Sequence, residues 1–307
     1  GAGLLVADIS NPAYPVELGS YDTPGNARAV AVSGGRVYVA DERSGLQILN
    51  TADPLHPVSL GSLKIDGWAF DVTVSGSTAY LAGAFGGLRV INVLDPTHPL
   101  DVGSLVWKQS NAVGVAVTNG QIYLADRKNG LRGINASDPV HLIQTGLFDL
   151  FQFARMVILG GDYAYVAAGF NGVRIFNISD PGHPVEVASY QADGLFYSLK
   201  LAGDRLYAGT MIRSQDAGVH VLDVSDPAHP AKIGYYADIA ECWGMDTAGN
   251  TLFVADAGDI KVIDFGNPAR PTLLGSIPIV PRGITVVNGL AYVTAEYEGM
   301  KILDVSD

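Results

Sequence analysis

A short sequence pattern recurs along the whole chain at intervals of about 42 residues. It usually begins with glycine, continues with alternating apolar residues, and closes on aspartate or asparagine, as in GLQILN from Gly45 and GVRIFN from Gly172. The closing residues stand at positions 8, 50, 92, 135, 177, 223, 264 and 304, so the spacings are 42, 42, 43, 42, 46, 41 and 40 residues. A fixed period in this range is typical of an array of one repeated supersecondary unit.

Each period contains four short segments with the composition of β-strands. In the first full repeat these are residues 28–33, 36–40, 46–50 and 58–63, which we call strands A, B, C and D. They are rich in β-branched and aromatic residues and are bounded by glycine, proline or aspartate. Four strands per period leave no room for a crossover helix, which excludes βαβ folds. The pattern therefore predicts an all-β propeller built from four-stranded antiparallel blades.

The number of strands predicts seven blades, because strands A and B each occur seven times. The chain ends after a strand C, while residues 16–21 supply a strand D, so we expect the N-terminal segment to close the ring. Strand C occurs eight times, and the sequence leaves open whether 3–8 or 299–304 pairs in the closing blade. We predict a single domain, 1–307, with blades at roughly 22–63, 64–105, 106–147, 148–190, 191–236, 237–277 and 278–307 plus 1–21.

Composition and charge limit the classes of partner. The net charge of −12 argues against nucleic acid, because binding to phosphates requires a basic surface. No apolar run approaches the ~20 residues that span a bilayer, so we expect no membrane span. The single cysteine, Cys242, excludes an internal disulfide, and it has no basic neighbour in sequence that would activate the thiol.

The repeated motif resembles the core of the LVIVD repeat family, GLxVxDVSDPxxP. It reads GVHVLDVSDPAHP from Gly218 to Pro230 and GVRIFNISDPGHP from Gly172 to Pro184, and the resemblance covers essentially the whole chain. The resemblance implies a secreted or surface-attached propeller of bacteria or archaea, with an extracytoplasmic binding or scaffold role. It transfers no catalytic residue, because the motif itself is structural.

Five of the six histidines share one position in the repeat, the turn after strand C. They are His56, His98, His141, His183 and His229. Equivalent atoms on neighbouring blades would lie roughly 13 Å apart, whereas zinc needs ligands at about 2 Å. We interpret these histidines as turn residues and expect no metal or cofactor. The aspartates and asparagines of the same turns invite a calcium interpretation, but Asx-turns explain them better.

The two faces of the predicted ring differ in variability. With strand A innermost, the D–A and B–C links emerge on one face, and the A–B and C–D links emerge on the other. The first face varies from blade to blade and carries the three tryptophans, Trp68, Trp107 and Trp243, and the insertion at 210–217. Function usually lies on variable loops of a rigid scaffold, so we predict that this face binds a protein, peptide or glycan.

One ring of residues stands at the expected mouth of the central channel, two positions before the first core residue of each strand A. Its members are Arg28, Phe70, Val113, Arg155, Tyr197, Trp243 and Arg282. Guanidinium groups suit carboxylate or phosphate, and aromatic faces suit sugars or cations. We predict a ligand site from the arginines and aromatic residues of this ring together with Trp68. In the alternative, aromatic residues plug the channel and the arginines pair with local carboxylates such as Asp41, Asp126, Asp256 or Glu241.

Three functions are compatible with this pattern: a non-enzymatic binding or scaffold propeller, a polysaccharide lyase or hydrolase acting at the channel mouth, or a structural subunit of a larger surface assembly. We favour the binding or scaffold propeller, because no histidine is expected near the axis. In the enzyme hypothesis Tyr197 acts as base while Arg28 or Arg155 neutralises a uronate carboxylate. Deeper in the channel, Lys200 and Asp246 stand at matching positions of adjacent blades and predict an inter-blade ion pair.

Overall fold

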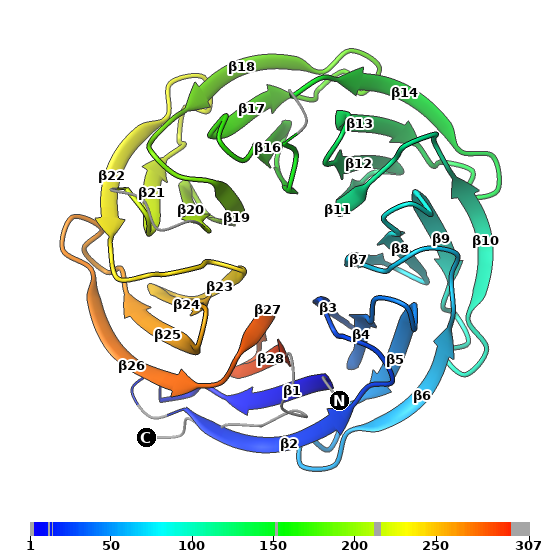
Figure 1. The fold of residues 1–307 in the computed structure, drawn as a ribbon, viewed down its shortest axis with the longest axis horizontal. Coiled ribbons are helices and arrows are strands. Elements are labelled where there is room, and N and C mark those ends of the chain that lie inside the picture. Colours follow the sequence, from blue (N-terminus) through cyan, green and yellow to red (C-terminus); the bar gives the residue numbers. More distant parts are fainter. Residues whose placement is uncertain (1–2, 12, 14, 151–152, 212–215, 296–307) are drawn as a thin grey trace.

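The computed structural model describes residues 3–295 except 12, 14, 151–152 and 212–215. These residues form seven four-stranded antiparallel sheets arranged as blades around a central axis, as the sequence predicts (Figure 1). None of them forms a helix long and apolar enough to cross a membrane.

The strands follow the predicted order within each blade, with strand A innermost and strand D at the rim (Figure 1). The A strands of blades 1 to 7 are β3 (Ala29–Ser33), β7 (Asp71–Ser75), β11 (Ala112–Thr118), β15 (Met156–Gly160), β19 (Phe196–Ala202), β23 (Gly244–Ala248) and β27 (Pro281–Val287). The B strands are β4 (Arg36–Ala40), β8 (Thr78–Ala82), β12 (Gln121–Asp126), β16 (Tyr163–Ala167), β20 (Arg205–Thr210), β24 (Thr251–Ala255) and β28 (Leu290–Ala295). The C strands are β5 (Leu46–Asn50), β9 (Leu88–Asn92), β13 (Gly130–Asn135), β17 (Val173–Asn177), β21 (Val219–Asp223), β25 (Asp259–Asp264) and β1 (Gly3–Asp8). The D strands are β6 (Val58–Leu63), β10 (Leu100–Leu105), β14 (Ile143–Phe148), β18 (Val185–Tyr190), β22 (Ala231–Tyr236), β26 (Thr272–Pro278) and β2 (Val16–Asp22).

The N-terminal segment closes the ring and supplies two strands of blade 7. The order of that sheet is β2-β1-β28-β27, with Leu5 of β1 opposite Val293 of β28. Just after β1, the Ile9 amide donates to the Gly289 carbonyl at 2.7 Å. The N-terminal copy of strand C therefore pairs in the closing blade, which the sequence left open. The other copy, 299–304, lies outside the described residues.

The glycine that opens the repeated motif is required by the packing of strand C against strand D. Gly45 has a φ of 75°, and a Cβ added there would lie 2.2 Å from the carbonyl oxygen of Leu63. A side chain at this position would thus strain the backbone and collide with the neighbouring strand. This contact explains why glycine recurs where strand C begins.

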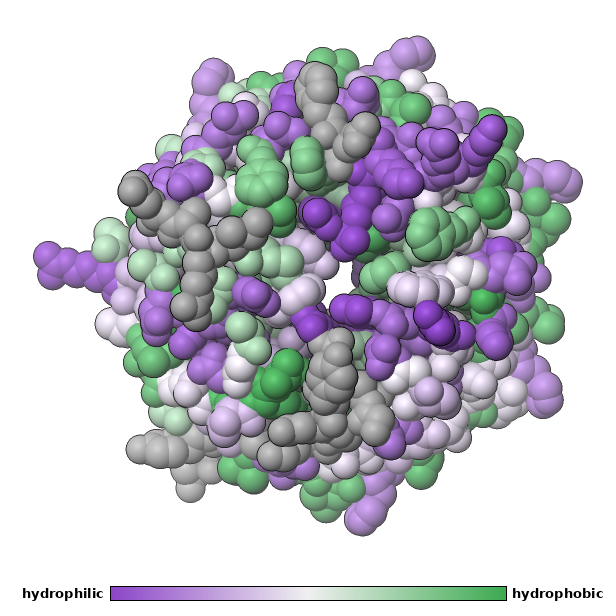
Figure 2. All heavy atoms as spheres, viewed as in Figure 1, coloured by the Kyte–Doolittle hydropathy of each residue, from purple (hydrophilic) through white to green (hydrophobic). Residues whose placement is uncertain are grey.

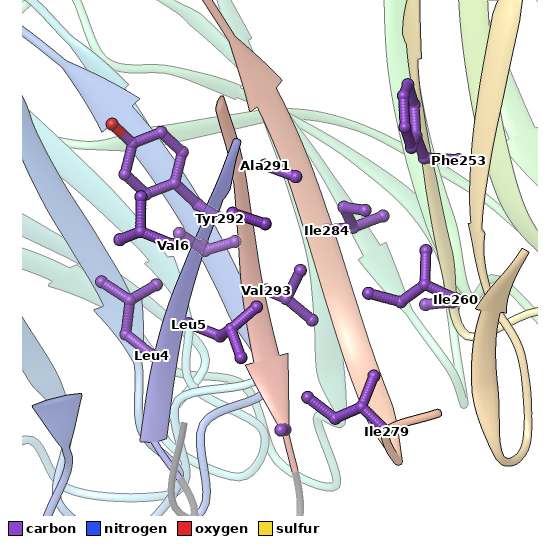
Figure 3. Packing of buried hydrophobic residues seen from close by; sticks show 14 of the residues in the cluster. Leu4, Leu5, Val6, Phe253, Ile260, Ile279, Ile284, Ala291, Tyr292 and Val293 are labelled. Atoms are coloured by element: carbon purple, nitrogen blue, oxygen red, sulfur yellow. The ribbon is translucent and has the colours of Figure 1, made fainter. Parts of the chain in front are cut away.

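The core consists of apolar layers between neighbouring blades. Figure 3 shows one of them, in which Ile284 of β27 and Leu5 of β1 face Phe253 and Ile260 of blade 6. All four side chains are buried. Because each blade covers the apolar faces of its neighbours, the ring is stabilised by hydrophobic burial all the way round.

The turn after strand C contains the Asx-turns predicted for its aspartate and asparagine residues. In blade 1 the Asn50 side chain accepts a hydrogen bond from the Ala52 amide at 2.9 Å, and Asp53 accepts one from the Leu55 amide at 3.0 Å. His56 Nδ1 lies 2.9 Å from the other oxygen of Asp53. The equivalent histidine–aspartate pairs are His98–Asp95, His141–Asp138, His183–Asp180 and His229–Asp226. The interpretation of these histidines as turn residues is confirmed.

An ion pair joins blades inside the channel, as predicted. Lys200 of β19 pairs with Asp246 of β23. The other carboxylate oxygen of Asp246 accepts a hydrogen bond from the Val286 amide of β27 at 2.7 Å. One carboxylate thus connects blades 5, 6 and 7 at the axis.

Candidate functional site

A cavity of about 400 Å³ occupies the mouth of the central channel. All seven members of the predicted ring line it, together with Asp71, Met156 and Arg127 among others. The opening is visible in Figure 2, where hydrophilic residues border much of it and gather over blade 3. The structure thus brings together the residues that the repeat position predicted to meet.

The ring positions are held by backbone hydrogen bonds between strand B and the residue before strand A. The amide of Arg28 donates to the carbonyl of Ala40 at 2.8 Å, and the amide of Arg155 donates to Ala167 at 2.8 Å. The same bond recurs from Phe70 and from Trp243, each at 2.9 Å. Because the bond repeats from blade to blade, these side chains start from equivalent points on a rigid backbone.

The arginines of the ring lie against the aromatic rings rather than standing apart from them. The Arg282 guanidinium is 3.7 Å from the centroid of the Trp243 ring, and Arg155 is 5.7 Å from that of Tyr197. Arg28 lies 5.7 Å from the Phe70 centroid. An aromatic face orients a guanidinium while leaving its in-plane N–H donors for other acceptors. The aromatic residues of the mouth therefore position cations and do not simply plug the channel.

Arg127 belongs to the site, although the mouth ring predicted from the repeat did not include it. It lies in the B–C link of blade 3, and its guanidinium is 5.7 Å from the Phe70 centroid, as is that of Arg28. The B–C links of blades 1, 2 and 4 reach the next blade through the isolated bridges Glu42–Ala69, Ala84–Ala112 and Gly169–Phe196, whereas Arg127 reaches Phe70 of the preceding blade. Arg127 could have been predicted from the sequence by comparing the B–C links of the seven blades as well as their A strands.

Arg28 pairs with Glu42, which is not among the carboxylates predicted for this role. Glu42 also accepts a hydrogen bond from the side chain of Asn26 at 3.0 Å. The predicted alternative of local pairing thus holds for Arg28, but with a different partner. Asp41 instead binds Thr23 and Gly25, and Asp126 pairs with Arg132 at 3.0 Å. Asp256 accepts the amides of Ala240 and Glu241.

Arg127 and Arg155 form a cationic pair within the cavity. Among the described residues no carboxylate makes an ion pair with either one, and the Nε atom of each is buried without a hydrogen-bond partner. Burial, and next the positive charge of Arg127, lower the pKa of the Arg155 guanidinium. Burial in the same cavity raises the pKa of Asp71 to about 7, so this carboxyl is largely protonated in mildly acidic solution. The Arg127–Arg155 part of the mouth is thus cationic in a chain whose net charge is −12.

Trp68, also predicted for the site, stands behind the cavity lining. Its ring centroid is 6.3 Å from that of Phe70, and the Arg43 guanidinium lies 4.9 Å from its own centroid. Trp68 therefore contacts Phe70 but is not among the residues that line the cavity.

The remaining chemically reactive side chains lie elsewhere. His220 is buried between β20 and β22, where Nδ1 is 2.9 Å from the Tyr190 hydroxyl and Nε2 is 2.9 Å from the Asp216 carbonyl oxygen. Burial lowers its pKa, so it remains a neutral hydrogen-bonding residue. Burial also raises the pKa of the Cys242 thiol, as expected of an unreactive cysteine. The described part of the chain contains no group of three potential metal ligands placed to hold an ion.

Comparison with known proteins agrees with the repeat and the fold. A model of the LVIVD repeat matches the chain seven times, at residues 1–23, 24–64, 66–106, 110–149, 153–192, 200–238 and 243–278. A search of curated proteins found no match.

Solved structures of similar fold have low sequence identity to the chain. A chain in the mitotic checkpoint complex is 11% identical with a TM-score of 0.72, and the alignment covers 92% of each chain. A protein from Lactobacillus plantarum is 14% identical with a TM-score of 0.70, covering 96% of this chain and 100% of that one. Virginiamycin B lyase from Staphylococcus aureus is 14% identical with a TM-score of 0.68, covering 91% and 98%. These similarities show the propeller fold and no more.

Proposed function

The chain belongs to the LVIVD repeat family, and from this premise we propose that it is a binding protein that holds an anionic partner at the mouth of its central channel. The observation that carries the proposal is the set of four arginines, Arg28, Arg127, Arg155 and Arg282, around one cavity. Of the described residues, Asp71 alone contributes a carboxyl group to the same lining. An excess of oriented guanidinium groups is the arrangement that recognises carboxylate, sulfate or phosphate.

The size of the cavity favours a ligand segment over a whole domain. A volume of about 400 Å³ is within the range of sites for small molecules or single units of a polymer. Partial burial also strengthens the attraction, because ion pairs are screened less in a recess than on an open surface.

Binding accounts for these residues better than catalysis does. Among the residues that the structure describes, the cavity lining contains no histidine, glutamate or cysteine, and its proton-transfer groups are Asp71 and Tyr197. The five histidines of the turns after strand C lie in the links between strands C and D, and His220 is enclosed within blade 5. A Tyr197 base beside Arg155 remains the enzyme alternative, which the experiment below separates from binding.

We also propose that the protein acts outside the cytoplasm, because its repeat resembles that of secreted and surface-attached propellers. Fractionation of cells that produce the protein tests this location. Recovery from the cell surface or the medium is the expected result, and recovery from the cytoplasm alone would contradict it.

The binding proposal is tested by calorimetric titration with polygalacturonate, heparin and polyglutamate at low salt. We expect at least one of them to bind. Arg155→Gln should weaken that binding by about 10-fold or more, since a hydrogen bond to a charged group contributes about 1.5–3 kcal/mol. The matched control is Arg270→Gln, which removes one exposed arginine from a C–D turn. Equal affinity of the two variants would refute the site, and release of unsaturated sugar products that is lost in Tyr197→Phe would favour the lyase.

A further inference from the structure

Arg127 and Arg155 form an inner subsite whose positive charges have no carboxylate partner among the described residues. The two guanidinium groups line one cavity, their Nε atoms are buried without hydrogen-bond partners, and Arg127 disfavours the charge on Arg155. Aromatic faces hold both, Phe70 beside Arg127 and Tyr197 beside Arg155. A single carboxylate between them would accept hydrogen bonds from both groups and relieve their repulsion.

A second tier of residues surrounds this subsite on the B–C links of four consecutive blades. At one equivalent position these links carry Arg43, Phe85, Lys128 and Phe170, and all four side chains are exposed. Phe85 and Phe170 are 61% and 56% exposed, which is unusual for phenylalanine. Cations and aromatic rings thus alternate around one side of the opening.

The outer tier lies next to the cavity lining because B–C links are bridged to the segment at the start of strand A in the next blade. Ala84, next to Phe85, bridges Ala112, and Ala112 precedes the cavity-lining residue Val113. In the same way the residue before Phe170, Gly169, bridges Phe196, which precedes Tyr197. A polymer with one unit in the cavity would therefore pass directly over the outer tier.

The chemistry of the outer tier favours a carbohydrate over a peptide. Exposed aromatic faces attract the polarised C–H groups on the flat side of a sugar ring. An extended peptide would instead need free backbone donors and acceptors, as in strand addition. Here the backbones of the B–C and D–A links are already bonded to each other, for example Ala84 to Ala112 at 2.9 and 3.2 Å.

We infer that the partner is an acidic glycan, with one uronate carboxylate between Arg127 and Arg155 and neighbouring sugars on Phe85, Lys128 and Phe170. This inference rests on the proposed function and specifies its ligand. The −12 net charge of the chain makes such binding depend on local contacts and not on long-range attraction.

The test is a calorimetric titration with galacturonate oligomers of one, two, four and six units. Affinity should rise about 10-fold or more from the monomer to the tetramer. Phe85→Ala and Phe170→Ala should each weaken tetramer binding by about 2- to 10-fold, the effect of losing one aromatic contact. Monomer binding should not change in these variants. The matched control is Leu94→Ala, which truncates a residue that is 74% exposed just after strand C.

Polyglutamate and maltohexaose, titrated in parallel, separate the two levels of the inference. Weak binding of both supports an acidic glycan. If polyglutamate binds as tightly as the hexamer in an Arg155-dependent manner, or if oligomer length has no effect, the glycan is wrong while the anion site stands. If no anion binds in an Arg155-dependent manner, both are wrong.

Discussion

Arg127 and Arg155 should destabilise the free protein while they create its binding site. The test of this claim is a double-mutant cycle with Arg127→Gln, Arg155→Gln and the double variant. Two unit charges repel by about 2 kcal/mol at a separation of about 9 Å and an effective dielectric constant of about 20. Each substitution also removes a cation–π contact of about 0.5–1 kcal/mol.

The cycle has a definite predicted sign. Each single variant should be more stable than the wild type by about 1 kcal/mol, because either change removes the whole repulsion. The second change brings no further relief, so the double variant should be about 2 kcal/mol less stable than the sum of the single effects.

Urea unfolding followed by tryptophan fluorescence at low salt measures these free energies. The coupling should shrink in 0.5 M salt, because exposed and half-buried charges are then screened. A galacturonate oligomer should stabilise the wild type and leave Arg155→Gln almost unchanged. A coupling near zero, or one of opposite sign, would refute the claim that these arginines repel each other.

Three further predictions concern the channel and the repeat. Asp246→Ala should lower the unfolding free energy by about 2–4 kcal/mol, because it leaves the Val286 amide and Lys200 without their acceptor; Asp246→Asn should cost less. Galacturonate affinity should fall as the pH rises through about 7, where Asp71 gains its negative charge; calorimetry of Asp71→Asn should show a flatter profile. Gly45→Ala should cost more than about 1 kcal/mol in a urea titration, because of its positive φ and the contact with strand D.

Each of these predictions has a contradicting outcome. Equal stability of Asp246→Ala and the wild type would mean that the axial carboxylate does not join the blades. A pH profile unaffected by Asp71→Asn would assign the titration to another group. A neutral Gly45→Ala would show that strand C can move away from strand D at little cost.

The sequence predicts the ring because its period repeats the same four-strand unit, and each unit needs neighbours on both sides. It does not decide between the two terminal copies of strand C, since 3–8 and 299–304 carry the same motif. The choice depends on which segment reaches β28, and the structure shows β1 there.

The site was predictable where it follows the repeat and not where it depends on contacts made by the B–C links. The seven residues of the mouth ring share one position of the repeat, so alignment of the repeats predicts that they lie together. Arg127 and Glu42 come from B–C links, and their contacts with Phe70 and Arg28 appear only in the structure. Asp41 is next to Glu42 in sequence, yet it turns to Thr23 and leaves Glu42 to face Arg28.

The most direct test of the account is a crystal structure of the protein with bound tetragalacturonate. We predict a uronate carboxylate within hydrogen-bonding distance of the Arg127 and Arg155 guanidinium groups, with further sugars over the Phe85 or Phe170 ring. Density for the glycan on the A–B and C–D face, or at the rim of the blades with an empty channel mouth, would contradict the account.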